Sequence, residues 1–303
     1  MISKTAIIHP SVKLGENVIV EDFAQIGYVF GESSDKLPET IIGDNSVIGT
    51  QSIIQAGSLI GKNFKLSPGA RVAENCVIGD DCMVGDRSVI KNVRFADNVT
   101  IGEFVMLGLE PKDKFDYKNM IKGMEMSVEI KSNSTVRSHS TIYAKTRMGE
   151  NFNTGHGVRI REGTFIGKSV NIGTNSQLEG FVEIGDKVLM HTNVHVGQFS
   201  KIEDESYISV GAVLTNTIHP LCPKAKECMQ GVTIKRKGKV TVNVTVAPDI
   251  TIGENALIGS GAVVLSDVEK DAVMVGIPAK QVRKVYELEC PYGLIDCPYE
   301  ETK

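Results

Sequence analysis

Aliphatic residues recur at every sixth position over most of the chain. One such row is Ile130, Val136, Ile142, Met148, Thr154, Ile160, Ile166, Ile172, Leu178, Ile184, Met190, Val196, Ile202 and Ile208. Thirteen of these fourteen residues are aliphatic, whereas 41% of the whole chain is hydrophobic, so chance would interrupt the row within a few steps. The same pattern runs through 8–26, 42–84, 95–107 and 240–258. A short, fixed period of this kind is typical of a solenoid.

A unit of six residues is long enough for one short strand and one turn. The aliphatic residue would point inward and stack on its counterpart in the next coil, and a small residue four positions later (Ser134, Ser140, Thr146) would fill the corner. Three such units close a triangular coil, and successive coils pair at ~4.8 Å like the strands of any sheet. About thirty repeats therefore predict an all-β fold, a parallel β-helix of about ten coils, followed by a short C-terminal helix or tail.

Three segments leave the period and divide the chain. We expect N-terminal coils over 1–107, an insertion over 108–127 that carries a short helix, a second block of coils over 128–265, and a C-terminal helix and cysteine-containing tail over 266–303. A polar segment over 27–40 and a loop over 216–238 also interrupt the coils. Long excursions from a rigid scaffold often carry binding specificity. For 27–40 and 108–127, covering a sheet edge or contacting another subunit is an equal alternative.

The charge balance and the first residues narrow the class of protein. Lys plus Arg number 33 against 37 for Asp plus Glu, so the net charge of −4 gives no reason to expect nucleic acid or a membrane as a partner. The start, "MISKTAIIHPSV", has no signal-peptide core and enters the repeat at once. We therefore expect a cytoplasmic protein.

The repeat and the closing segment "VGIPAKQVRK" carry a resemblance to a known family. The chain resembles the hexapeptide-repeat acyltransferases, whose fold is a left-handed parallel β-helix that usually trimerises. The closing segment looks like that of members that use acetyl-CoA. The resemblance implies that basic side chains here meet the coenzyme A phosphates, and that three backbone positions adjoin the pantetheine arm. The cations would be Lys280, then Arg283 and Lys284, and the backbone positions would be Gly259, Ser260 and Ala262. A solvated basic turn of helix after a proline-terminated coil is the alternative interpretation of 280–284.

His156, in "TGHGVRIREGTFIG", is the first candidate for a catalytic residue. It follows Thr154, the one non-aliphatic member of the row, where the lost burial costs on the order of 1 kcal/mol or more. The resemblance to the lipid A acyltransferases implies that a histidine at this phase is the general base. Their oxyanion donor is a backbone N–H one coil later, which corresponds to Thr174. An imidazole with a pKa near ~6.5 can accept the proton of an attacking amine, and a fixed N–H can stabilise the oxyanion.

Other interpretations of the histidines remain open. His139 lies about one coil before His156 and would line the same cleft, whereas a hydrogen-bonded surface or interface role is the alternative for His156 itself. The γ-type carbonic anhydrases use the same fold with three histidines on zinc, and His156, His191 and His195 superficially fit that pattern. Their positions within the repeat scatter them, however, and their spacing is H-x3-H rather than H-x4-H.

Six cysteines fall into two classes. Cys76 and Cys82 occupy the small corner position of consecutive repeats, where a free thiol behaves as a compact apolar residue. The other four lie outside the regular coils: Cys222, Cys228, Cys290 and Cys297. In a reducing compartment they predict a zinc or iron site that ties the loop to the tail, with four unrelated thiols as the alternative.

The segment "TIKRKGKVTVNVTVAPDITIGENALIGSGAVV" resembles the nucleotide-aminosugar N-acetyltransferases. The chain is thus expected to be a homotrimer that transfers acetyl from acetyl-CoA to the amino group of a nucleotide-linked aminosugar. Because similar solenoids also serve as non-catalytic assembly or regulatory subunits, that class is the rival hypothesis.

Overall fold

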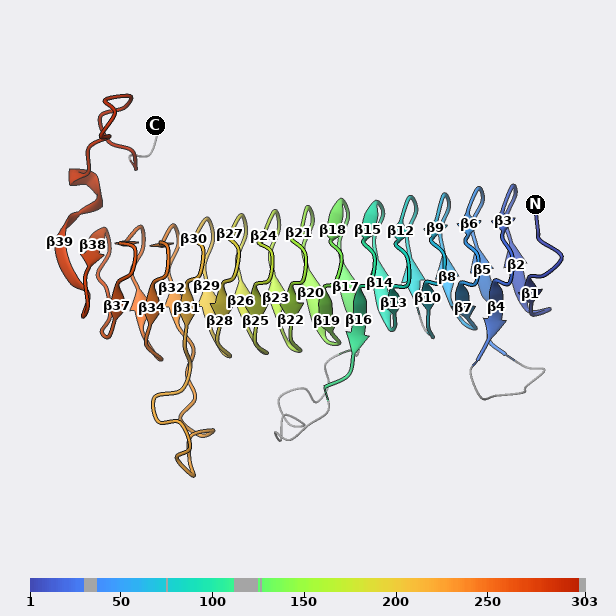
Figure 1. Ribbon diagram of the computed structural model, residues 1–303, viewed down its shortest axis with the longest axis horizontal. Coiled ribbons are helices and arrows are strands. Elements are labelled where there is room, and N and C mark those ends of the chain that lie inside the picture. The colour runs from blue at the N-terminus through green and yellow to red at the C-terminus, as the bar shows by residue number, and fades with distance from the viewer. Residues whose placement is uncertain (30–36, 75, 112–124, 126, 300–303) are drawn as a thin grey trace. The chain divides into compact units, whose positions relative to one another are not determined.

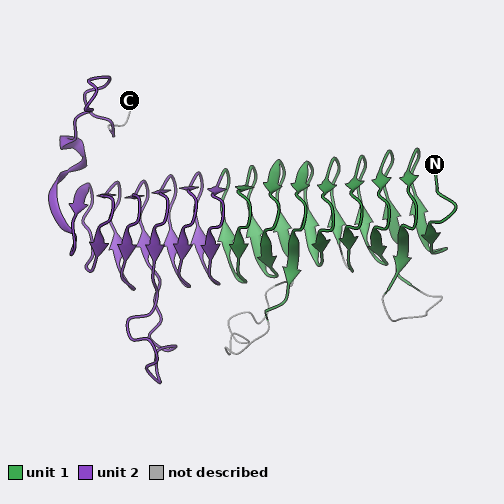
Figure 2. Cartoon of the chain, viewed as in Figure 1, with its two compact units in different colours: residues 1–169 green, residues 170–303 purple. Residues whose placement is uncertain are grey.

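The computed structural model describes residues 1–29, 37–74, 76–111, 125 and 127–299. Contacts within the chain divide it into two compact units, unit 1 (Met1–Ser169) and unit 2 (Val170–Lys303), shown in different colours in Figure 2. Short parallel strands make up nearly all of the regular structure in both units (Figure 1). The strands follow one another in a fixed rotation through three sheets, which we name B, C and A in chain order.

Unit 1 contributes eight strands to sheet B, eight to sheet C and seven to sheet A among its described residues. Sheet B contains β1 (Ile7–Ile8), β4 (Gln25–Tyr28), β7 (Ile53–Gln55), β10 (Arg71–Val72), β13 (Val89–Ile90), β16 (Met106–Leu109), β19 (Thr141–Tyr143) and β22 (Arg159–Ile160). Sheet C contains β2 (Val12–Leu14), β5 (Thr40–Ile42), β8 (Leu59–Ile60), β11 (Val77–Ile78), β14 (Val93–Phe95), β17 (Val128–Ile130), β20 (Thr146–Met148) and β23 (Phe165–Ile166). Sheet A contains β3 (Ile19–Val20), β6 (Val47–Ile48), β9 (Lys65–Leu66), β12 (Met83–Val84), β15 (Val99–Ile101), β18 (Ser134–Val136) and β21 (Asn153–Thr154).

Unit 2 continues the same rotation. Sheet B contains β25 (Gln177–Leu178), β28 (His195–Val196), β31 (Val213–Leu214), β34 (Thr245–Val246) and β37 (Val263–Val264). Sheet C contains β26 (Glu183–Ile184), β29 (Lys201–Ile202), β32 (Thr233–Ile234) and β35 (Thr251–Ile252). Sheet A contains β24 (Asn171–Ile172), β27 (Leu189–Met190), β30 (Tyr207–Ile208), β33 (Lys239–Val240), β36 (Leu257–Ile258), β38 (Ala272–Val275) and β39 (Lys280–Lys284).

This arrangement is the parallel β-helix that the period of six predicted, and its left hand is the one that the family resemblance implied. Residues one coil apart pair in register, as Ile53 pairs with Arg71 and Val72 with Ile90. From β3 onward the repeated aliphatic residues are buried in the coils, because alternate strand residues point to opposite faces of a sheet. The described strands build eight coils in unit 1 and five in unit 2, more than the expected ten. Repeats that depart from a strict period still close a coil, as the step from Ile90 to Phe95 does.

We name the three turns of each coil the B–C, C–A and A–B corners after the sheets that they join. At the C–A corner the second turn residue has a left-handed backbone conformation, which asparagine tolerates well: φ is 55° at Asn63 and 58° at Asn151. The next position usually holds a small or branched residue, but Phe64 and Phe152 occupy it in two coils and are fully buried. In both cases a serine one coil earlier accepts the phenylalanine N–H, Ser46 for Phe64 (3.3 Å) and Ser134 for Phe152 (3.2 Å).

All three excursions leave the coils at a B–C corner. The first lies between β4 and β5, the second between β16 and β17, and the third between β31 and β32. The predicted helix in 108–127 falls on 112–124 and 126, which lie outside the described residues. The third excursion covers 215–232 and extends away from the coils of unit 2 (Figure 1), and the coil resumes at Thr233, earlier than the expected end at 238. Val232 and Ile234 are already buried there.

The C-terminal end of unit 2 differs from the helical tail that we expected. After β38 the chain turns through Gly276 and Pro278, and β39 returns antiparallel to β38, with Val273 opposite Arg283 and Val275 opposite Lys280. The helix is reduced to a single 3₁₀ turn, η1 (Val285–Glu287). Among the residues that the structure describes, no helix is long and apolar enough to cross a membrane.

Candidate functional site

His156 lies on an A–B corner of unit 1, in the turn between β21 and β22. Its side chain is exposed, and it stands between two glycines, of which Gly157 has a positive φ of 64°. The Gly157 N–H donates to the Ser138 carbonyl in the preceding coil (3.0 Å), which fixes the turn that carries the imidazole. A rigid corner therefore presents this ring outward rather than into the core.

The β-ladder is irregular directly beside His156, at Thr154. In the preceding step of sheet A the Gly102 N–H donates to the Val136 carbonyl (2.8 Å). One coil later the Arg137 N–H instead donates to the buried Thr154 hydroxyl (2.9 Å), and the Arg137 guanidinium donates to the Thr154 carbonyl. β18 and β21 consequently share a single registered pair, Thr135 with Asn153. Threonine interrupts the aliphatic row because its hydroxyl takes over one backbone bond.

A carboxylate faces the histidines of this corner. The Ser138 hydroxyl donates to Glu103 Oε2, which connects two successive coils across the second excursion. Chiefly this hydrogen bond, then a backbone N–H and the nearby imidazoles of His156 and His139, hold the pKa of Glu103 below its usual value. The corner thus combines an ionised carboxylate with two imidazoles. Glu103 was missed in the sequence because 35 residues separate it from Ser138 instead of one coil's length.

His139 is part of the same corner but is held differently. Its N–H donates to the Glu103 carbonyl (3.0 Å), and its ring is stacked on Phe104, with ring centroids 5.3 Å apart and planes 1° from parallel. The predicted neighbourhood of His139 and His156 on one corner is therefore observed in unit 1. Stacking fixes the His139 ring, whereas the His156 side chain is exposed between two glycines.

The described residues that flank the second excursion lie at a different corner from the one that carries His156. Leu109 and Val128, the strand residues that flank it, border a B–C corner, whereas His156 is on an A–B corner.

Thr174, the predicted oxyanion donor, lies in unit 2 on the A–B corner after β24. Its carbonyl accepts the Asn193 N–H (2.9 Å), and the residue is half-buried. His191 packs edge-on against Tyr207, with ring centroids 5.3 Å apart, and His195 belongs to β28. In the described residues no group of three or more histidine, cysteine, aspartate or glutamate side chains could hold a metal ion.

The predicted coenzyme A backbone positions lie on the last A–B corners of unit 2. Ser260 Oγ is 3.1 Å from Thr241 Oγ1, and that hydroxyl donates to the Ile258 carbonyl (2.6 Å). Ala262 is buried, and its carbonyl accepts the Thr245 N–H (3.0 Å). Beside this corner, the outer face of sheet A has a cavity of about 510 Å³, lined by Glu205, Tyr207, Ser209, Lys239, Thr241, Val242, Leu257 and Tyr299.

The three predicted cations are not gathered in one place, because they lie along strand β39. Lys280 and Arg283 are exposed, and Lys280 stands at the end of β39 that adjoins the turn at Gly276. Lys284, at the other end, donates to the Lys270 carbonyl (3.2 Å) and pairs with Glu269 (3.6 Å). Four residues of extended chain span roughly 13 Å, so the two lysines serve different corners.

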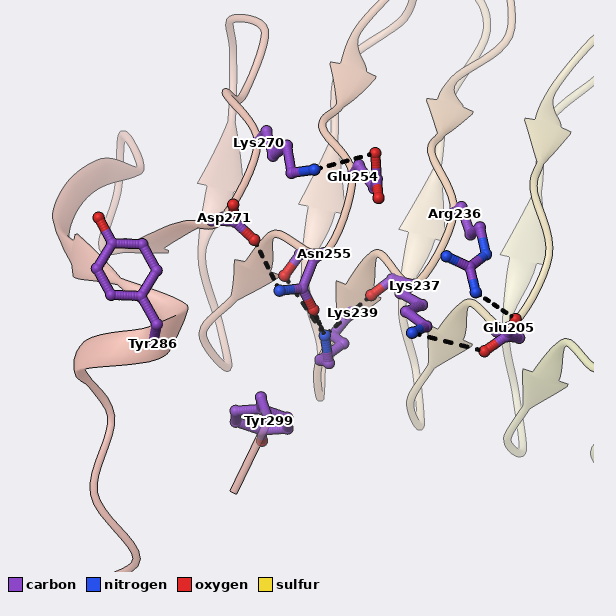
Figure 3. A pocket seen from close by; sticks show the side chains of 10 residues that line it. All are labelled: Glu205, Arg236, Lys237, Lys239, Glu254, Asn255, Lys270, Asp271, Tyr286 and Tyr299. Carbon is purple, nitrogen blue, oxygen red and sulfur yellow. Dashed lines mark hydrogen bonds and ion pairs between the residues drawn. The ribbon is translucent and has the colours of Figure 1, made fainter. Parts of the chain in front are cut away.

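A second cavity, of about 1000 Å³, lies at the C–A corners of unit 2 and is bordered by Tyr286 and Tyr299 of the tail (Figure 3). Its charges compensate one another: Arg236 donates to Glu205 (2.8 Å), and Lys270 pairs with Glu254 (3.4 Å). Lys239 donates to Asn255 Oδ1 (2.6 Å), and its ammonium is 4.9 Å from the centre of the Tyr299 ring. Burial lowers the pKa of Lys239.

The four cysteines outside the coils do not form the predicted metal site. Cys222 and Cys228 are exposed on the third excursion. Cys290 and Cys297 belong to the tail, which leaves the coils of unit 2 far from that excursion (Figure 1), and Cys297 is buried against the Val285 carbonyl. The described residues therefore do not support a metal site built from these four thiols.

Thiol labelling at pH 8 should separate the cysteines into two groups. Burial raises the pKa of Cys76 and of Cys82 to about 11, so both should resist alkylation until the protein unfolds. Backbone N–H groups around Leu294 and Tyr292 lower the pKa of Cys290, so this thiol should react at a lower pH than an ordinary cysteine. Mass spectrometry after timed alkylation measures each site. Rapid labelling of Cys76 in the folded protein would contradict this core.

These features define a hexapeptide-repeat β-helix protein with a histidine-bearing corner. The family model "Hexapeptide repeat of succinyl-transferase" matches 249–274, and "GMPPB C-terminal domain" matches 1–108. Each of these two models matches only part of the chain, and the hexapeptide repeat is the feature that the chain shares with the first family and with the relatives described next.

Two relatives illustrate the similarity. Galactoside O-acetyltransferase of Escherichia coli is 24% identical over 52% of this chain and 85% of its own length. The 2,3,4,5-tetrahydropyridine-2,6-dicarboxylate N-acetyltransferase of Staphylococcus aureus is 31% identical over 32% of this chain, which spans only 33% of that enzyme. Among solved structures, Arabidopsis UDP-N-acetylglucosamine acyltransferase aligns with 94% of this chain and 74% of its own, at 18% identity and a TM-score of 0.36.

Proposed function

We propose that the protein is an acyltransferase that moves acetyl from acetyl-CoA to the amino group of a nucleotide-linked aminosugar, with His156 as general base. The observation that carries the proposal is the His156 corner itself, an exposed imidazole beside an ionised carboxylate on a rigid turn. Relatives of this chain are named acetyltransferases, which supports the reaction class. The aminosugar is proposed from the resemblance of the closing coils.

The proposed reaction uses the imidazole to accept one proton. As the amine nitrogen bonds to the thioester carbon, His156 takes the proton that the amine loses. The negative charge of Glu103 favours the imidazolium that results. When the C–S bond breaks, the same proton can pass to the leaving thiolate, so the enzyme returns to its initial state. The Thr174 N–H is proposed as the oxyanion donor, from its place one coil after His156 in the repeat.

For the acyl donor we propose the sheet A face of unit 2. The 510 Å³ cavity adjoins Thr241 and Ser260, and its apolar wall of Val242 and Leu257 suits a pantetheine chain. Lys280 and Arg283 remain exposed for phosphate contacts, whereas Lys284 is already engaged by Glu269. We propose a homotrimer in which the third excursion of a neighbouring subunit borders the acceptor site.

Acetyl-CoA should raise the melting temperature of the protein. At ten times its Kd, a ligand that binds only the folded state stabilises it by about 1.4 kcal/mol, which corresponds to a few degrees for a chain of this size. Differential scanning calorimetry measures the shift. The Lys280→Glu variant supplies the control, because it should bind coenzyme A more weakly and show a smaller shift. A melting temperature unchanged by acetyl-CoA would favour the non-catalytic assembly or regulatory subunit.

A screen of nucleotide aminosugars and simple sugars, read by thiol release, then identifies the acceptor.

A further inference from the structure

A small cavity in unit 1 lies apart from the His156 corner, on the outer face of sheet B beside the first excursion. Its volume is about 280 Å³, and its walls are formed by Ile7, Gln25, Tyr28, Val29, Ile53, Gln55 and Arg71. These residues come from the first four strands of sheet B and from the residue that follows β4.

Two buried polar atoms in this wall have no hydrogen-bond partner in the described chain, Gln55 Oε1 and Arg71 Nε. Gln55 is only 2% exposed. More than nine in ten buried polar groups in proteins are hydrogen-bonded, and an unpaired one costs about 1–3 kcal/mol. The backbone carbonyl of Gln55 has a partner, because it accepts the Ser58 hydroxyl (3.1 Å). The unpaired group of Gln55 is its side-chain oxygen, which a ligand could contact.

Neighbouring contacts fix the shape of the cavity. Arg71 pairs directly with Ile53, two residues before Gln55. An irregularity between Ile26 and Tyr28 places Tyr28 opposite Gln55, and it depends on Gly27, whose φ is 84°. The Tyr28 ring is packed edge-on against His9, with ring centroids 5.1 Å apart.

We propose that this cavity binds a nucleobase. The two unpaired atoms are one acceptor and one donor, so the matching ligand edge carries a donor beside an acceptor. A nucleobase has such an edge, and its flat, weakly polar faces fit between the aliphatic walls and the Tyr28 ring. A free phosphate lacks the flat, weakly polar faces that would fit between these walls. The volume holds a base, so the ribose and phosphate of a nucleotide would extend out of the cavity.

Calorimetric titration of the full-length protein with AMP, GMP, UMP and CMP tests this proposal, with ribose 5-phosphate and inorganic phosphate as probes that lack a base. At least one nucleotide should bind, and neither probe should. Gln55→Leu should weaken binding about tenfold, as expected for one lost hydrogen bond. Gln177→Leu, on the exposed part of β25, is the matched control and should not change the affinity.

Two further measurements keep the outcome decisive. Gln55→Leu should not lower the unfolding midpoint, because it removes an unpaired group rather than a bond. Saturation-transfer NMR on the unmodified protein should show contacts to base protons even if a variant folds poorly. Binding that is equal for ribose 5-phosphate, absent for all four nucleotides, or unchanged by Gln55→Leu would overturn the proposal. His156→Ala should retain nucleotide binding, which separates this site from the proposed acyl transfer.

Discussion

Replacing His156 by alanine should lower kcat for acyl transfer by ~100-fold or more while the fold is unchanged. The ring is exposed on a turn, and the neighbouring backbone bonds, such as Gly157 N–H to the Ser138 carbonyl, do not involve it. The loss should fall mainly on kcat, because a general base acts on a proton that is transferred only during the reaction. Steady-state kinetics with thiol detection, alongside circular dichroism, measures both quantities.

The controls for this prediction come from the same chain. His9→Ala, in the first coil of unit 1 and away from the proposed acyl-transfer site, should leave the rate unchanged. Glu103→Gln keeps the hydrogen bond from Ser138 but removes the negative charge, so it should lower the rate less than His156→Ala does. A normal rate in His156→Ala would move the proton transfer to His139 or to the substrate.

Phe152→Ala should lower the free energy of unfolding by ~3–5 kcal/mol. Phe152 fills a corner position where most coils have a small residue, and it is fully buried. The turns on either side limit collapse around the lost ring, so the cavity contributes to the cost. The Ser134 hydroxyl can still accept the backbone N–H of residue 152, so the effect reports on packing. Urea unfolding followed by circular dichroism measures the change.

Phe165→Ala provides the comparison, because this ring is 37% exposed on the outer face of sheet C. Its loss should cost less than about 1.5 kcal/mol. Equal effects of the two substitutions would mean that unit 1 does not unfold cooperatively around the Phe152 core. In that case the melting of single coils, and not the whole unit, would determine the transition.

The period of six was sufficient to predict the architecture, because each aliphatic residue is an inward position whose neighbour in space is one coil away. The pairing of Arg71 with Ile53 and Val89 shows this directly. The number of coils was underestimated because counting required a strict period, whereas a step of five residues between Ile90 and Phe95 also closes a turn. The segment 280–284 was expected to be helical, but the backbone of β38 gives it a pairing partner that local sequence does not reveal.

The candidate site was only partly predictable. Thr154 marked an irregular ladder, and its physical cause, a hydroxyl that takes over the Arg137 N–H, became visible only in the structure. Glu103 stayed hidden, since the second excursion separates it from Ser138 in sequence while the coils bring them together. The four-cysteine site was predicted wrongly for the opposite reason. Two similar cysteine pairs in the sequence do not lie close together in the structure.

The reversed direction of β39 has a consequence for how molecules of this protein meet. A parallel coil left open at its end would offer a template for another copy, and stacked copies would grow into fibres. On sheet A, β39 instead presents an edge of opposite polarity that carries Lys280, Arg283 and Lys284. Like-charged edges repel one another, so this strand protects the C-terminal end of the sheet against polymerisation.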